Sequence, residues 1–206
     1  MEQIIRNFYE GGFMMYVIGA LLIIALIIIL ERFYFLFFKA SINAPKFMEK
    51  IFQLYREKKI NEALAYCNEL DKPLTKIISA AVQNHESMDK EIQNAVDEVF
   101  LQVAPKIKKN TPLLSIISQV ATILGLLGTI IGLMESFTAL SGVNPALRTE
   151  ALASGISKAM VTTAFGLIVA GICIFAFAIF NSKIEKIVDD IDEFSVRIIN
   201  HIKRYR

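Results

Sequence analysis

Residues 115–136 read SIISQVATILGLLGTIIGLMES, an apolar run interrupted at short intervals by small and hydroxylated residues. These residues recur at steps of three and four, so a helix places them in one narrow stripe. The stripe consists of Ser115, Ser118, Thr122, Gly125, Thr129, Gly132 and Ser136. Two interpretations stay open at this point. Small residues let helices pack closely in a bilayer, which the stripe alone favours, whereas a row of hydroxyls also suits the wall of an aqueous or ion-conducting path.

Three segments are long, apolar and free of charged residues: residues 11–30, 113–134 and 159–182. Each has about the 20 residues that a helix needs to cross the hydrocarbon core of a bilayer. Because Glu31 and Arg32 follow the first segment in place of a cleavage site, we expect a retained anchor rather than a signal peptide. The sequence therefore predicts an all-α integral membrane protein, with three transmembrane helices and long helices that extend into a cytoplasmic helical bundle.

The basic residues are distributed unevenly, and Lys and Arg near membrane ends stay on the cytoplasmic side. Residues 39–110 carry twelve of the 22 Lys and Arg residues, and the tail after Ser182 carries six. We therefore expect a multi-pass protein of the bacterial inner membrane with a periplasmic N-terminus and a cytoplasmic C-terminus. The predicted segments are 1–38 (N-terminal segment and first transmembrane helix), 39–110 (cytoplasmic helical domain), 111–137 (second transmembrane helix), 138–154 (short periplasmic loop), 155–182 (third transmembrane helix) and 183–206 (cytoplasmic amphipathic tail).

Helix-start signals divide the cytoplasmic segment into short amphipathic helices. Pro45 suits the first turn of one helix, Asn61 the N-cap of a second and Asp71 the N-cap of a third. A fourth helix is expected to start at Met88 and to be kinked at Pro105.

The tail carries an apolar stripe whose members are three or four residues apart. They are Ile184, Ile187, Ile191, Phe194, Ile198 and Ile202. A helix standing alone would expose this stripe, so we expect it to pack either on the middle segment or on another copy of the chain.

The sequence contains no arrangement of residues typical of an enzyme. It has no Ser/His/Asp set, glycine-rich phosphate loop or zinc pattern, and Cys67 and Cys173 are expected to lie far apart. We therefore expect no catalytic residue, no metal and no cofactor. The basic residues are interpreted as topology signals rather than as a nucleic-acid-binding patch.

Glu31 and Arg32 end the first span and are followed by a run rich in aromatic residues. An acid–base pair beside an aromatic belt fits the cytoplasmic interface, with the Arg32 side chain extending its charge toward water. We predict an interfacial ion pair between these two residues, next to membrane lipid. An ion relay through Glu31 is the alternative.

The third span has a small-residue face of its own. It consists of Gly155, Ala159, Thr162, Gly166, Ala170 and Cys173, with Thr163 beside it. A single threonine in a membrane helix proves little, because its hydroxyl can bond to the backbone of its own helix. Two spans that both carry Gly and Thr at helical spacing favour a lined cavity.

Two motifs in these spans resemble those of the MotA/TolQ/ExbB proton-channel family. LGLLGTIIGLM at 124–134, followed by ESF at 135–137, resembles the second-span motif, and GISKAMVTTAFGL at 155–167 resembles the third-span motif. NEALAYC at 61–67 is similar to a cytoplasmic helix of the same proteins. Three spans and a short tail resemble the TolQ/ExbB branch, whereas flagellar stator subunits have four spans.

The resemblance implies a homo-oligomer, expected to be a pentamer, around the single transmembrane helices of a dimeric TolR/ExbD-like partner. In such a complex a flow of H+, or alternatively Na+, moves the partner's helices relative to the surrounding oligomer. Thr129 and Thr163 fall at the family's pore threonines. This chain departs from the family at Lys158, where ExbB has an acidic residue, and at 170–172, where many relatives have a proline.

None of the three spans carries a carboxylate near mid-membrane, since Glu31 lies at the inner boundary and Glu135 at the outer one. Threonine hydroxyls do not ionise near neutral pH and cannot carry a proton alone. Conduction therefore needs an acid from another subunit, which matches the aspartate on the partner's helix in the family. The residues predicted to line the ion pathway are Thr129, Thr163, Thr162 and Thr122, and those predicted to set close packing are Ser118, Gly125, Gly128, Gly132 and Gly166.

We thus predict a channel-forming subunit of an inner-membrane motor that couples the ion-motive force to mechanical work, such as energising outer-membrane transport. A gliding- or flagellar-type stator subunit is the alternative within this class. A non-conducting membrane scaffold is the alternative from another class, because the same stripes serve there as packing seams. A transporter of soluble substrates is disfavoured, since three spans offer no inverted repeat.

Overall fold

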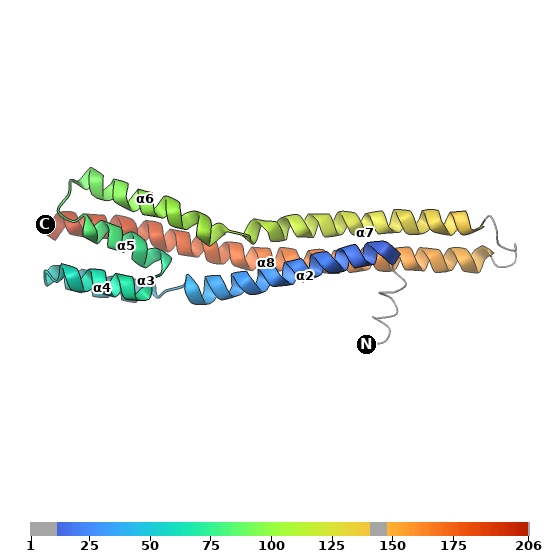
Figure 1. Ribbon diagram of the computed structural model, residues 1–206, viewed down its shortest axis with the longest axis horizontal. Helices are drawn as coiled ribbons and strands as arrows, with labels where there is room; N and C mark the ends of the chain where they lie inside the picture. Colours follow the sequence, from blue (N-terminus) through green and yellow to red (C-terminus); the bar gives the residue numbers. More distant parts are fainter. Residues whose placement is uncertain (1–11, 141–147, 206) are drawn as a thin grey trace. The chain divides into compact units, whose positions relative to one another are not determined.

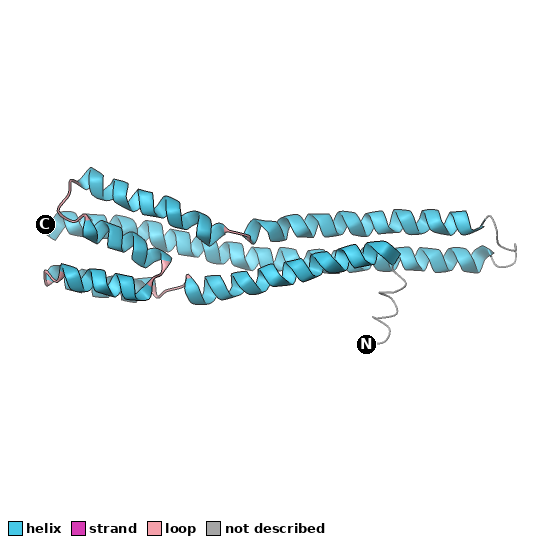
Figure 2. Cartoon of the chain, viewed as in Figure 1, coloured by secondary structure: helices cyan, strands magenta, loops and turns pink. Residues whose placement is uncertain are grey.

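The computed structural model describes residues 12–140 and 148–205, and every regular element in these ranges is helical (Figures 1 and 2). The elements are α2 (Gly12–Tyr34), a π-helical turn (Phe35–Lys39), α3 (Ala44–Arg56), α4 (Ile60–Leu70), α5 (Pro73–Gln83), α6 (Asp89–Lys108), α7 (Thr111–Ala139) and α8 (Arg148–Tyr205). Three helical stretches are long and apolar enough to cross a membrane, namely Gly12–Arg56, Asp89–Thr138 and Arg148–Tyr205. The predicted fold class is confirmed.

The chain forms two compact units. The span unit comprises the residues up to Leu30 together with Asn110–Ile179, and the bundle unit comprises Glu31–Lys109 together with Phe180–Arg206. Helices α2 and α8 contribute residues to both units, because neither is interrupted at the boundary.

Helix α8 runs for 58 residues and includes both the predicted third span and the predicted tail. It begins at Arg148, within the predicted loop 138–154, of which 141–147 lie outside the described residues. The apolar stripe of the tail is buried, with each side chain at most 7% exposed: Ile184, Ile187, Ile191, Phe194, Ile198 and Ile202. The stripe therefore packs within the bundle unit of the same chain, the first of the two predicted alternatives, and does not by itself require a second copy.

In the bundle unit, α4 packs on α3 and α5, and α5 packs on α6. The C-terminal part of α8 joins them, since Lys203 Nζ lies 3.1 Å from Asp89 Oδ2 of α6 and the His201 ring stacks against Phe52 of α3. Eight of the 11 residues of α5 are buried, which makes α5 the central helix of this bundle.

Two of the predicted helix starts are wrong by a small shift. Helix α4 begins two residues earlier than expected, with Lys59 rather than Asn61 at its N-cap, so Asn61 lies inside the first turn. Asp71 does not cap α5; it ends α4 in the left-handed conformation (φ 42°), which Asp adopts more readily than most residues. The start of α5 is set by Pro73, whose fixed φ suits the first helical position.

The remaining predicted helix starts, at Pro45 and Met88, agree with the structure. Pro45 lies in the first turn of α3, after Asn43, whose side-chain oxygen accepts a backbone N–H of that turn at 3.3 Å. Met88 directly precedes α6. Helix α6 continues past Pro105 to Lys108, and α7 begins after Asn110, which has a left-handed φ of 61°. The kink at Pro105 stays a prediction.

Candidate ion pathway in the span unit

Helices α7 and α8 meet along a seam of small residues. A β-carbon on Gly166 would lie 2.7 Å from the carbonyl oxygen of Ala121 and 2.9 Å from Cα of Gly125, which is closer than side chains approach backbone atoms. A β-carbon on Gly128 would overlap the methyl group of Thr162. The residues predicted to set close packing are all buried in the span unit: Ser118, Gly125, Gly128, Gly132 and Gly166. The seam is thus formed by backbones that approach each other where glycine leaves room.

Two hydroxyl groups donate hydrogen bonds across this seam. Thr163 Oγ1 of α8 donates to the carbonyl of Gly125 at 2.8 Å, and Ser118 Oγ of α7 donates to the carbonyl of Ala170 at 3.1 Å. Hydrogen bonds between membrane helices contribute about 0.6 kcal/mol each. The pair therefore contributes modestly to the contact between α7 and α8.

The other three predicted pathway threonines bond to their own helices and lie at different depths. Thr162 is 1% exposed and belongs to the seam, whereas Thr122 is exposed. Thr129 is half-buried, like Thr163, and its hydroxyl donates to the carbonyl of Leu126 at 2.6 Å. Among the described residues, no group of three or more His, Cys, Asp or Glu is placed to hold a metal ion. Hydroxyls and carbonyls are the polar groups that this pathway offers.

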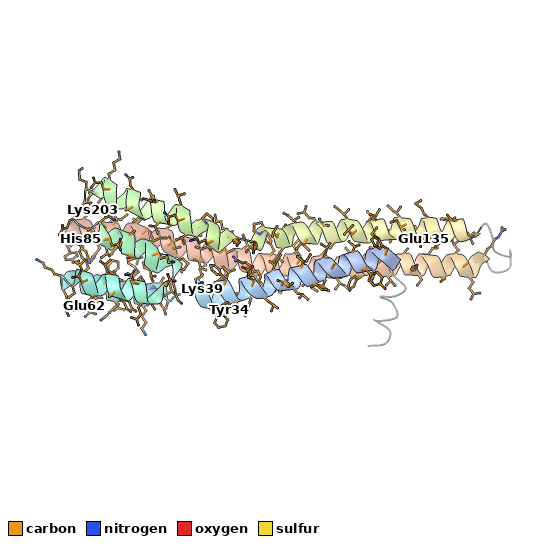
Figure 3. The ribbon with its side chains drawn as sticks, viewed as in Figure 1. Tyr34, Lys39, Glu62, His85, Glu135 and Lys203 are labelled. Carbon is orange, nitrogen blue, oxygen red and sulfur yellow. The ribbon has the colours of Figure 1, made fainter. Side chains whose placement is uncertain are left out.

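Lys158 and Glu135 pair at one end of the seam. Lys158 Nζ lies 3.9 Å from Glu135 Oε2, and both side chains remain substantially exposed (Figure 3 labels Glu135). A cavity of about 100 Å³ adjoins the pair and is lined by Gly12, Phe13, Met14, Gly128, Ile131, Gly132, Glu135, Lys158, Ala159 and Thr162. The carboxylate here comes from α7 and the cation from α8. This contact was not predicted, because Glu135 and Lys158 belong to different helices and no helical spacing relates them.

The predicted ion pair of Glu31 and Arg32 forms, but Arg32 is buried and does not reach water. Arg32 Nη2 lies 2.7 Å from Glu31 Oε1, but Arg32 is only 2% exposed and does not extend to water. Its Nη1 donates to the carbonyls of Lys106 and Ile107, both at 3.4 Å, at the end of α6. The last carbonyls of a helix carry partial negative charge and lack helical partners, so they stabilise a buried guanidinium. The expectation of a snorkelling Arg32 is wrong for this reason.

Comparison with known proteins gives the class of this molecule. Residues 69–193, more than half of the chain, match the MotA/TolQ/ExbB proton channel family. The chain is 31% identical over 189 residues to a biopolymer transport protein of Methanothermobacter thermautotrophicus named as an ExbB homologue, which covers 92% of this chain and 67% of that protein. The chain belongs to the MotA/TolQ/ExbB proton channel family, as its span motifs predicted.

Further relatives agree with the predicted branch. The TolQ protein of the Tol-Pal system from Haemophilus influenzae is 30% identical over 114 residues, 53% of this chain and 50% of that protein. An ExbB-like biopolymer transport protein of Synechocystis is 30% identical over 149 residues, 72% of this chain and 70% of that protein. In fold, the chain is similar to a solved structure of C. jejuni MotAB, with a TM-score of 0.64, 18% identity and coverage of 93% of this chain and 76% of that one.

Proposed function

We propose that this protein is the ion-conducting subunit of an inner-membrane motor of the TolQ/ExbB type. In this proposal five copies surround the single transmembrane helices of a TolR/ExbD-like dimer, and proton flow drives movement of one against the other. The N-terminus is periplasmic and the C-terminus cytoplasmic. The observation that carries the proposal is the pair of half-buried hydroxyls, Thr129 and Thr163, which border the glycine seam inside two membrane-length helices.

The spans supply polarity without a carboxylate near mid-membrane, and this favours a partner that brings the acid. A hydroxyl can orient water or accept a hydrogen bond, but it does not ionise near neutral pH. An intramembrane carboxylate from the partner, held beside Thr129 and Thr163, completes a site that can take up and release a proton. The chain alone is then expected not to conduct.

The first experiment removes the Thr129 hydroxyl at nearly constant volume. We expect Thr129→Val to lower proton flux, in vesicles that contain both subunits, to the background of vesicles lacking the partner. Thr138→Val is the matched control, because Thr138 lies on the same helix, is exposed and donates to its own helix at 2.8 Å. Native mass spectrometry of each complex verifies the ring size. Wild-type flux in an intact Thr129→Val complex contradicts the proposal.

The second experiment separates conduction from packing. Thr163 and Ser118 both donate across the seam, so Thr163→Ala and Ser118→Ala each remove one interhelical hydrogen bond of about 0.6 kcal/mol. If Thr163 also serves the ion, its alanine variant loses flux while Ser118→Ala retains it. Equal flux in both variants means that the Thr163 hydroxyl serves packing alone. A wild-type complex without flux above background favours the non-conducting scaffold, for which the observed glycine seam is the specific support.

A further inference from the structure

The bundle unit has a cavity of about 210 Å³ whose walls are unusually basic. It is lined by Phe35, Lys39, Asp71, Pro73, Lys76, Val103, Lys106 and Ile107. Three ammonium groups face one carboxylate there, so the cavity carries a net positive charge. Its volume is below the roughly 300–1,000 Å³ of sites for drug-sized ligands, which suits a small anionic group.

The three lysines of this cavity differ in whether they form an ion pair. Lys76 Nζ lies 2.8 Å from Asp71 Oδ1, and this contact, followed by the more distant charge of Lys39, holds the pKa of the Asp71 carboxyl below its usual range. Asp71 therefore stays ionised and neutralises Lys76. The ammonium groups of Lys39 and Lys106 make no ion pair with any described residue. They are the cations that remain for a ligand.

The backbone around the cavity favours an anion at the membrane surface. Phe35 and Lys39 belong to the π-helical turn that follows α2, where the Ala40 N–H donates to the Phe35 carbonyl at 2.8 Å; such turns often occur at functional sites. Pro73 begins α5, whose N-terminal dipole also attracts negative charge. Next to the turn, Tyr34 is 66% exposed, as is typical of an aromatic side chain at the bilayer interface (Figure 3).

We propose that this cavity binds the phosphate headgroup of an anionic phospholipid, with Lys39 and Lys106 as its cationic contacts. Phospholipid is the source of the phosphate favoured here, because the cavity is lined by the turn that directly follows the apolar helix α2, beside the exposed aromatic side chains of Tyr34 and Phe38. Basic pockets at the cytoplasmic ends of spans are suited to such headgroups, and each lysine near the surface strengthens the attraction. The proposal is independent of ion conduction, so it can fail or hold without affecting the function proposed above.

The test titrates the full-length protein in neutral detergent with dioleoylphosphatidylglycerol and counts bound lipid by native mass spectrometry. The variant Lys39→Gln/Lys106→Gln should bind this lipid about tenfold more weakly than the wild type. The matched control is Lys108→Gln/Lys109→Gln, which removes the same charge from exposed lysines at the same end of α6 but outside the cavity. It should bind within about twofold of the wild type.

Two further arms make the result decisive. Lys39→Arg/Lys106→Arg keeps the charge and should retain binding, which excludes general misfolding as the cause of a loss. Dioleoylphosphatidylcholine should bind weakly to all variants, and sodium phosphate should not displace the anionic lipid. The proposal is overturned if the cavity and control variants lose binding equally, if the cavity variant binds like the wild type, or if free phosphate competes fully.

Discussion

At the scale of single residues, His201 is a titratable group of the bundle unit whose surroundings oppose its charge. Its ring lies 4.6 Å from that of Phe52 and 4.5 Å from that of Tyr205, and its Nε2 is buried without a hydrogen-bond partner among the described residues. Burial lowers the pKa of His201 below its ordinary value, and the charges of Arg56 and Arg204 lower it further. The folded bundle unit therefore favours the neutral imidazole.

This shift predicts that acid destabilises the bundle unit. The unfolded chain binds a proton at this histidine below about pH 6.5, whereas the folded chain resists it, so the stabilisation present above that pH is lost as the pH falls toward the lowered pKa. We expect the midpoint of thermal unfolding, followed by circular dichroism, to fall by roughly 2–5 °C more between about pH 7.5 and pH 5.5 than in His201→Phe. His85→Gln is the control and should keep the wild-type difference. An unchanged pH dependence in His201→Phe contradicts this assignment.

At the scale of helices, two glycines of α8 offer a matched comparison. A β-carbon on Gly166 would meet backbone atoms of α7 at 2.7 and 2.9 Å, whereas one on Gly171 would meet no atom within 4 Å. Backbone cannot rotate away as a side chain can, so Gly166→Ala must separate the two helices, at a cost of about 1–3 kcal/mol. Gly171→Ala should leave stability unchanged or raise it slightly, because alanine favours helix.

The comparison is measured by unfolding both variants in detergent with increasing sodium dodecyl sulfate and following helix content. We expect the Gly166→Ala midpoint to lie well below that of the wild type, and the Gly171→Ala midpoint to match or exceed it. Equal midpoints for the two variants would show that the seam between α7 and α8 does not contribute to stability.

The helices themselves were largely predictable from sequence, because the length of an apolar span and the spacing of apolar residues can be read without knowing the tertiary contacts. Pro45 and Met88 coincided with helix starts. Asp71 did not, because its left-handed conformation ends α4 and Pro73 sets the start of α5, and Asn61 lies inside the first turn of α4 rather than at its N-cap. Local signals of this kind specify a helix end only to within a residue or two.

The sequence predicted which residues form the candidate site, but not which of them are buried against the neighbouring helix. Steps of three and four place Ser118 and Thr122 in one stripe, yet Ser118 is buried against α8 and Thr122 is exposed. Which edge of a stripe meets the neighbouring helix depends on how the two helices are rotated, and one sequence does not encode that visibly. The same holds for Arg32, whose partners Lys106 and Ile107 are more than 70 residues away in the chain.

At the scale of the whole molecule, the distribution of basic residues predicts which side of the membrane each segment occupies. The concentration of Lys and Arg in residues 39–110 and in the tail predicts that both are cytoplasmic and that the connection between the second and third spans is periplasmic. Thiol labelling can test this without removing the native cysteines. Cys67 and Cys173 are buried, and burial raises the pKa of the Cys67 thiol to about 12, so it has almost no reactive thiolate near neutral pH.

We therefore predict the labelling of two single-site variants by a membrane-impermeant maleimide. Asn144→Cys, in the predicted periplasmic loop and outside the described residues, should react on intact cells. Glu86→Cys should react only after the inner membrane is opened; the Glu86 side chain is 89% exposed, so a failure on intact cells reflects the barrier and not burial. The wild type, with its two buried thiols, sets the background in both conditions. Labelling of Glu86→Cys but not Asn144→Cys on intact cells would invert the topology, and would place the basic cavity and the bundle unit on the periplasmic side.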